Sequence, residues 1–257
     1  LLVHSHCIDH AMSFQPFSLH TTATMALALC VAACDAAQGT AAAPKPGEPE
    51  QPKVRALADK TLKGLRFVEG GSFQMGDFGP VDSPDKLYYS FSSDNKPMHK
   101  VTLDSFSMSA YKATYADHDA YAAATGKARV GLDDITKRIR HPEAAAGMTW
   151  FQAREYCQWL GQQLGLPMDL PTEAQWEYAA RARGKFFLFA TDNGKMEEPR
   201  NVWGFDQRDA YAQKHDLQGA PSMPPLGQFP PTPLGLYDMM TDGFEWTLDW
   251  YSAKYYE

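Results

Sequence analysis

The residues best suited to chemistry lie near the end of the chain, in PPTPLGLYDMMTDGFEWTLDWY, residues 230–251. This stretch combines two turn-forming clusters, spaced acids and two tryptophans. Its acids Asp238, Asp242, Glu245 and Asp249 offer carboxylate oxygens. On composition alone, acids and glycines held among aromatic side chains are typical of an active-site loop.

The cysteines give a different indication. The chain has 4 of them, Cys7, Cys30, Cys34 and Cys157, and three precede residue 35. The region after residue 62 therefore holds one cysteine, which predicts neither an internal disulfide nor a paired-thiol site there. Cys157 falls on the inner face of a predicted helix, where a buried cysteine acts as a small apolar side chain. We predict no catalytic residue.

Acids and histidines elsewhere offer weaker candidates. Glu173 and Glu177 resemble a catalytic carboxylate pair, but acids at a helix start are favoured by the helix dipole, and we prefer that interpretation. The histidines of the predicted globular part are scattered singly, at His99, His118, His141 and His215. Ligand-bearing helices place metal ligands at regular spacing, so this scatter does not predict a histidine metal site.

Composition bounds the class of protein. The 257 residues are 44% hydrophobic and carry a net charge of −7, without a basic block. The length is sufficient for one packed domain with additional segments, and the charge argues against nucleic-acid binding. With 18 Pro, 19 Gly and 12% aromatic residues, the chain is expected to form a loop-rich α+β domain.

The N-terminal region predicts export. Residues 25–33, MALALCVAA, form an apolar run of signal-peptide length that is too short to span a bilayer. The run ends in Val31-Ala32-Ala33-Cys34, similar to the site at which bacterial lipoproteins are cleaved and lipidated. Residues 1–34 are therefore expected to be a leader, with a lipid on Cys34 that anchors the chain to the bacterial membrane, facing the periplasm. No Lys or Arg precedes Lys45, and an untranslated leader is the alternative. Residues 35–62, rich in Ala and Pro, predict a disordered tether.

Periodicity predicts the elements of the domain, residues 63–257. Residues 67–76 read as two short strands around a Gly-Gly turn, and residues 99–111 as a strand whose alternation slips at Asp104-Ser105. Helices are expected over residues 114–125, 149–164 and 170–183. The last two open with capping boxes at Thr149 and Thr172.

In this order, FVEGGSFQMG, LPTEAQWEYAARA, NVWG and GLYDMMTDGFEWTLDW resemble the formylglycine-generating enzyme family, the sulfatase-modifying-factor domain. The resemblance covers about residues 65–251. It implies an irregular, loop-rich variant of the C-type-lectin-like fold, of α+β class and short at its C-terminal end.

The resemblance also implies chemistry. Enzymes of this family oxidise a sulfatase cysteine with two copper-binding cysteines that follow the EWTxDW block. The chain ends at Glu257, before such a segment. A soft Cu(I) site needs at least two such ligands, so neither copper nor formylglycine formation is expected of this chain.

Structural calcium is the cofactor that the resemblance implies. The first site would use the side chains of Asp238 and Glu245 and the carbonyls of Thr241 and Gly243, because calcium prefers several hard oxygen ligands. A second, weaker site would use Asn201, Val202 and Asp216. The chain departs from the family pattern at Thr241-Asp242, Phe244 and Asp169.

Three hypotheses remain open. The first is a non-catalytic, envelope-anchored binding module, a pseudoenzyme that holds a protein partner. The second is a fragment of an active metal-dependent oxidase that acts on protein cysteine. The third is a chain that does not fold, because missing strands would leave a sheet edge open.

Overall fold

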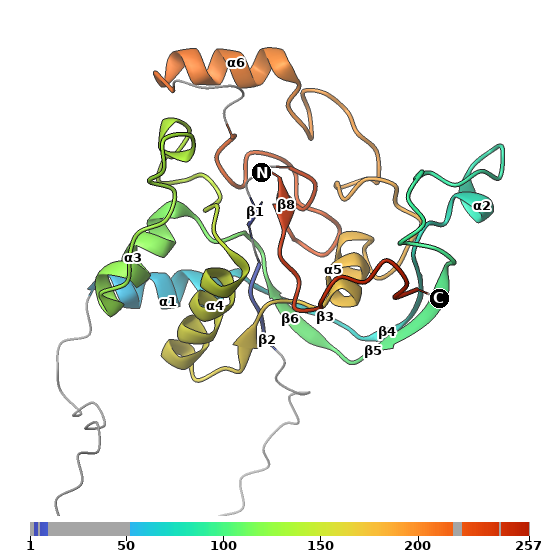
Figure 1. Ribbon diagram of the computed structural model, residues 1–257, viewed down its shortest axis with the longest axis horizontal. Helices are drawn as coiled ribbons and strands as arrows, with labels where there is room; N and C mark the ends of the chain where they lie inside the picture. Colours follow the sequence, from blue (N-terminus) through green and yellow to red (C-terminus); the bar gives the residue numbers. More distant parts are fainter. Residues whose placement is uncertain (1–2, 5, 10–51, 218–222, 242, 257) are drawn as a thin grey trace, which may run out of the picture.

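A computed structural model describes residues 3–4, 6–9, 52–217, 223–241 and 243–256 of the chain (Figure 1). These residues form helices around small β-sheets, which confirms the predicted α+β class. The helices are α1 (Pro52–Gly64), α2 (Gly79–Asp82), α3 (Tyr115–Thr125), α4 (Trp150–Leu164), α5 (Glu173–Ala180) and α6 (Phe205–Lys214), with a 3-10 turn at Thr136–Arg138. The strands are β1 (Val3–His4), β2 (Ile8–Asp9), β3 (Leu65–Val68), β4 (Gly71–Met75), β5 (His99–Leu103), β6 (Phe106–Ser109), β7 (Met168–Asp169) and β8 (Phe244–Glu245). None of the helices in these ranges has the length and apolar character that crossing a bilayer requires.

The main sheet has the strand order β3-β6-β2-β7, and each neighbouring pair is antiparallel. Strands β4 and β5 form a separate antiparallel pair. The slip predicted at Asp104-Ser105 is where the chain passes from one sheet to the other, because β5 ends at Leu103 and β6 begins at Phe106. Gly70 lies against this crossing: a Cβ there would come within 2.4 Å of the Leu103 carbonyl oxygen, so only glycine fits without a backbone shift.

Local capping signals set the helix starts as predicted. The hydroxyl oxygens of Thr149 and Thr172 accept from backbone N–H groups three residues later, and a third capping box opens α3 at Thr114. Each cap stabilises its helix by about 1 kcal/mol. Helix α5 ends earlier than predicted, because Ala182 and Arg183 take positive φ angles of 45° and 68° that cannot continue a helix.

The folded part begins earlier than residue 63. Within the predicted tether, residues 52–62 belong to α1, while residues 35–51 lie outside the described residues. Val54, Leu57 and Ala58 fall on one face of α1 and are buried, and this apolar stripe makes the segment part of the core. The tether prediction is therefore wrong for residues 52–62.

Residues near the start of the chain also contribute to the fold. Strand β2 fills the position between β6 and β7, and β1 pairs in parallel with β8 (Figure 1). Cys7 forms a disulfide with Cys157 on α4, across a sequence separation of 150 residues. The prediction that Cys157 is unpaired is wrong in this structure, because its partner comes from the segment interpreted as a leader. Cleavage of that leader and the lipid on Cys34 stay predictions, since Cys34 lies outside the described residues.

Two apolar clusters form the core. The first packs the inner face of α4, including Ala153, Cys157 and Leu160, against residues of α1 and α3. The second surrounds β6 and α5 and includes Met108 and Tyr178. The closing stretch contributes to both, so it is part of the core as well as the surface.

Candidate functional site

The closing stretch, residues 230–251, is held against the starts of α4 and α5. The indole of Trp246 donates to the Met148 carbonyl at 2.9 Å, and that of Trp150 donates to the Thr247 carbonyl at 2.8 Å. The Leu248 amide donates to the Pro171 carbonyl at 2.8 Å. These hydrogen bonds pair two indole N–H groups and one backbone amide with backbone carbonyls. They hold the segment around β8 against the starts of α4 and α5.

Glu245 on β8 is a buried carboxylate with two basic neighbours, His6 and Lys112. Its Oε2 lies 2.6 Å from His6 Nδ1, and its Oε1 lies 3.6 Å from Lys112 Nζ. Burial alone would raise the pKa of Glu245. The charges of His6 and Lys112 and the bond to His6 outweigh that effect and lower the pKa to about 2. Glu245 is therefore ionised across the physiological pH range.

Asp238 lies on the same side of the stretch, in a left-handed conformation with φ of 58°. Its Oδ2 accepts from the Gly227 amide at 2.7 Å, while its Oδ1 is buried and has no hydrogen-bond partner among the residues that the structure describes. Burial raises the pKa of Asp238, and the Gly227 bond and the nearby charges of Lys112 and His6 oppose this rise. A buried oxygen without a donor favours a nearby cation.

Lys112 supplies that positive charge from the segment between β6 and α3. Its side chain has 0% exposure, and its Nζ donates to the Thr241 carbonyl at 2.5 Å. The structure thus brings together three of the predicted calcium ligands, Asp238, Thr241 and Glu245. It also places a lysine on two of them.

These residues fit a cation, but they do not fit the calcium ion that was predicted. A divalent ion would compete with Lys112 Nζ for the Thr241 carbonyl and for Glu245. Like unit charges 4 Å apart repel by about 4 kcal/mol at an effective dielectric constant of 20, and a divalent ion doubles that cost to about 8 kcal/mol. The fourth predicted ligand, Gly243, lies on the wall of the cavity described below, and Asp242 lies outside the described residues.

The second predicted calcium site is not assembled by the described contacts. The side-chain oxygen of Asn201 accepts from the Glu197 amide at 2.8 Å, and its nitrogen donates to Asp192 and to the Lys195 carbonyl. Val202 is buried, and Asp216 follows the end of α6. Asn201 therefore organises a turn. Within the described ranges, no group of three or more His, Cys, Asp or Glu side chains is placed to hold a metal ion.

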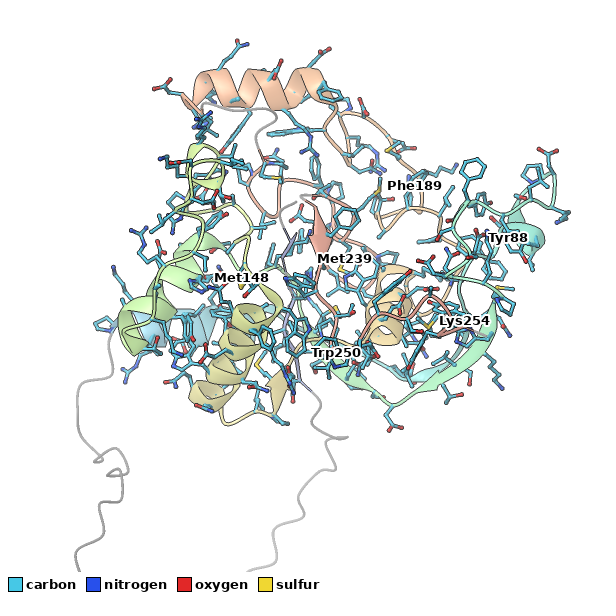
Figure 2. All side chains as sticks on the ribbon, viewed as in Figure 1. Tyr88, Met148, Phe189, Met239, Trp250 and Lys254 are labelled. Carbon is cyan, nitrogen blue, oxygen red and sulfur yellow. A yellow bond between two sulfur atoms is a disulfide. The ribbon has the colours of Figure 1, made fainter. Side chains whose placement is uncertain are left out.

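A cavity of about 670 Å³ lies beside the closing stretch. Acids from α5 and apolar side chains share its wall, and Figure 2 labels Phe189 and Met239 among them. Glu173 accepts from the Tyr256 hydroxyl at 3.3 Å, whereas Glu177 accepts from the Gly76 amide at 3.0 Å and pairs with Arg181. Burial raises the pKa of both acids. The two acids were predicted to act only on the helix dipole, but they also line the cavity. The cavity suits a ligand with apolar and basic groups.

Comparison with known proteins decides the family. The family model described as "Sulfatase-modifying factor enzyme 1-like domain" matches residues 50–257. The chain belongs to this family. The resemblance inferred from its motifs is confirmed, and the match includes α1, in agreement with the folded boundary.

Individual relatives of the sulfatase-modifying-factor family have different names. The formylglycine-generating enzyme of Bos taurus is 25% identical over 73% of this chain and 58% of that protein. The enzyme of the same name from Streptomyces coelicolor is 27% identical over 86% of this chain and 77% of that protein. The serine/threonine-protein kinase pkn1 of Chlamydia pneumoniae is 28% identical over 82% of this chain, yet the match covers only 31% of the kinase. The chain thus spans about a third of the length of that kinase.

The copper chemistry implied by the family does not fit the cysteines described. Cys7 and Cys157 are bonded to each other, so their sulfurs do not offer a pair of thiolates. Cys30 and Cys34 lie outside the described residues. We derive no oxidation step from these residues.

Sequence reasoning missed the cationic half of the buried cluster. His6 lies in the segment that the sequence predicts to be a leader, and no site predicted from the sequence includes Lys112. A signal for Lys112 was present: it lies between the buried residues Ala110 and Ala113, in a segment with no other charged side chain from Phe106 to Ala116. A lysine in such a segment is rarely buried without a partner, so it pointed to a buried acid elsewhere.

Proposed function

We propose that this sulfatase-modifying-factor domain is a non-catalytic binding module, anchored to the bacterial envelope, that holds a protein partner there. The main support for the proposal is the state of the described cysteines. In the full chain, Cys7 and Cys157 are joined in a disulfide. If the chain is instead cleaved before Cys34, Cys7 is removed and Cys34 is consumed by its lipid, which leaves Cys157 alone. Among the described cysteines, neither form offers the thiolate pair that copper oxidation needs.

The relatives support a binding role as well. The matched region is less than a third of the chlamydial pkn1 kinase, as expected if this domain accompanies another activity. A protein named inactive C-alpha-formylglycine-generating enzyme 2, from Bos taurus, is 33% identical over 46% of this chain. A relative with this domain is thus named inactive, which supports a member of the family that does not oxidise cysteine.

The cavity beside the closing stretch is the binding site that we favour. Glu173 lines the cavity and accepts from the Tyr256 hydroxyl, and within the described ranges it forms no ion pair. A basic side chain of a partner protein, carried on an apolar segment, matches this chemistry. The module would then recognise its partner by charge and shape, with no covalent step.

Two experiments test this proposal. First, the purified full chain is incubated with Cu(I), oxygen and a sulfatase peptide that contains the target cysteine, with the Streptomyces coelicolor enzyme as the positive control. We expect no conversion of cysteine to formylglycine by mass spectrometry, and conversion would establish the alternative, an active oxidase of this family.

The second experiment addresses the partner. The chain is crosslinked in membranes and compared with the Glu173→Gln variant and with Glu155→Gln, which changes an exposed acid paired with Lys127. We expect one protein to be crosslinked in stoichiometric amount. Its yield should fall in Glu173→Gln and stay unchanged in Glu155→Gln. If no such protein is recovered, the proposed protein partner is wrong. If both variants crosslink alike, the partner does not bind at the cavity. Lipid on Cys34 is tested separately, by the mass of the mature N-terminal peptide.

A further inference from the structure

We propose that the ammonium of Lys112 is a built-in cation that takes the place of a divalent metal ion under the closing stretch. The stretch is then fixed in the fold without calcium. This inference concerns how the module is stabilised, and it does not depend on the proposed binding function.

The position of Lys112 makes it an internal group. It follows β6, and its backbone neighbours are bonded into the core: the Ala110 carbonyl accepts from the Tyr237 amide at 2.8 Å, and the Ala113 carbonyl accepts from the Ala146 amide at 2.8 Å. The side chain is completely shielded from solvent. A charged lysine persists in such a place only where oxygens replace its water shell.

Those oxygens come from the closing stretch. Lys112 Nζ donates to the Thr241 carbonyl and lies 3.6 Å from Glu245 Oε1. Its charge also acts on Asp238, whose buried Oδ1 receives no hydrogen bond from any described residue. One carbonyl and one carboxylate thus lie beside the ammonium, and the charge of a second carboxylate, Asp238, interacts with it. Hard oxygen groups of this kind would otherwise suit calcium.

Charge balance explains why a metal ion would be excluded. Asp238 and Glu245 bring at most two negative charges, and Lys112 together with His6 brings up to two positive charges. Counting the groups that the structure describes, an additional divalent ion would leave an excess of buried positive charge, and burial makes such an excess costly. The lysine and the metal ion are therefore alternatives.

Metal analysis and thermal melting test the proposal on the full chain. The wild-type protein is dialysed against millimolar CaCl₂ and then against metal-free buffer, and its calcium is measured by plasma mass spectrometry. We expect far less than one calcium per chain, and a melting midpoint that EGTA and CaCl₂ do not change. One calcium per chain that is lost in Asp238→Asn, or a midpoint lowered by EGTA, would overturn the proposal.

The variant Lys112→Gln tests the role of the charge directly. It removes the cation but keeps a polar side chain, and we expect the midpoint to fall by about 10 °C, because an uncompensated buried charge remains. Millimolar CaCl₂ should recover part of this loss in Lys112→Gln and in no other variant. The control is Lys127→Gln, which removes an exposed lysine paired with Glu155 and should melt like the wild type.

Two results for the variant would contradict the inference. A Lys112→Gln protein that melts like the wild type would show that the ammonium is not needed. A destabilised variant that CaCl₂ does not restore would show that the position does not stand in for a metal ion. If Lys112→Gln does not accumulate as a folded protein, the calcium content and EGTA response of the wild type still decide the question.

Discussion

At the scale of single residues, the closing stretch owes its stability to buried charge. Glu245 lies between His6 and Lys112 and is ionised, and Asp238 is buried; within the described part of the chain, one carboxylate oxygen of each has no hydrogen-bond donor. Removing either partner of a buried pair typically costs 3–5 kcal/mol, because the other charge remains uncompensated. Glu245 is therefore the residue whose ionisation should most affect folding.

We expect the free energy of unfolding to decrease as the pH falls from about 4.5 towards 2, because Glu245 becomes protonated. Its folded pKa of about 2 lies below its ordinary value of 4.5, so the stabilisation is present above the ordinary value and is lost as the pH falls through the folded value. A difference of that size corresponds to about 3 kcal/mol. Denaturant melts at several pH values measure the loss.

Glu245→Gln should remove most of this acid dependence and destabilise the protein at neutral pH. Glu155→Gln, at an exposed pair, is the matched control and should retain the acid dependence of the wild type. Asp238 acts in the opposite direction: its raised pKa means that its stabilising protonated form is lost as the pH rises through the folded value. If Glu245→Gln loses stability at acid pH as much as the wild type does, Glu245 is not the main cause of that loss.

The sequence predicted Asp238 and Glu245 as ligands of one calcium ion, and it gave no indication that the basic groups His6 and Lys112 lie near them. His6 is separated from Glu245 by 239 positions and Lys112 from Thr241 by 129 positions. Contacts over such distances depend on the complete topology. Local patterns do not carry that information.

At the scale of elements, the signals that were predicted correctly are local ones. The capping boxes at Thr149 and Thr172 involve residues three apart, and the slip at Asp104-Ser105 lies within one strand-like run. Helix α1 was missed for a physical reason. Its apolar stripe consists of only three buried side chains, Val54, Leu57 and Ala58, and the segment before it is rich in Ala and Pro. The composition of the whole segment therefore favoured a tether over a short helix that packs against α3 and α4.

The contribution of α1 can be measured with two leucines on that helix. Leu57 is 5% exposed and Leu62 is 50% exposed. Leu57→Ala should lower the free energy of unfolding by about 2–5 kcal/mol, because it leaves a cavity in the first core cluster. Leu62→Ala should change it by less than about 1 kcal/mol. Equal effects in chemical denaturation would mean that α1 does not belong to the core.

At the scale of the whole molecule, two features compete for the start of the chain. The Cys7–Cys157 disulfide and the β1–β8 pairing need residues before Cys34. Lipidation of Cys34 would remove those residues. The two arrangements cannot exist in the same polypeptide, so the state of the N-terminus also decides whether Glu245 keeps His6 as a partner.

We therefore expect a non-reduced digest of the purified protein to give either a Cys7 peptide linked to a Cys157 peptide or a lipidated N-terminal Cys34 peptide, and no polypeptide with both. The 150-residue separation gives the disulfide a stabilisation of about 5 kcal/mol in the chain-entropy model. Dithiothreitol should consequently lower the melting midpoint of the disulfide form by many degrees. The lipidated form should not respond, because its only remaining described cysteine is Cys157. A reductant-sensitive lipidated form would show that Cys157 has another partner.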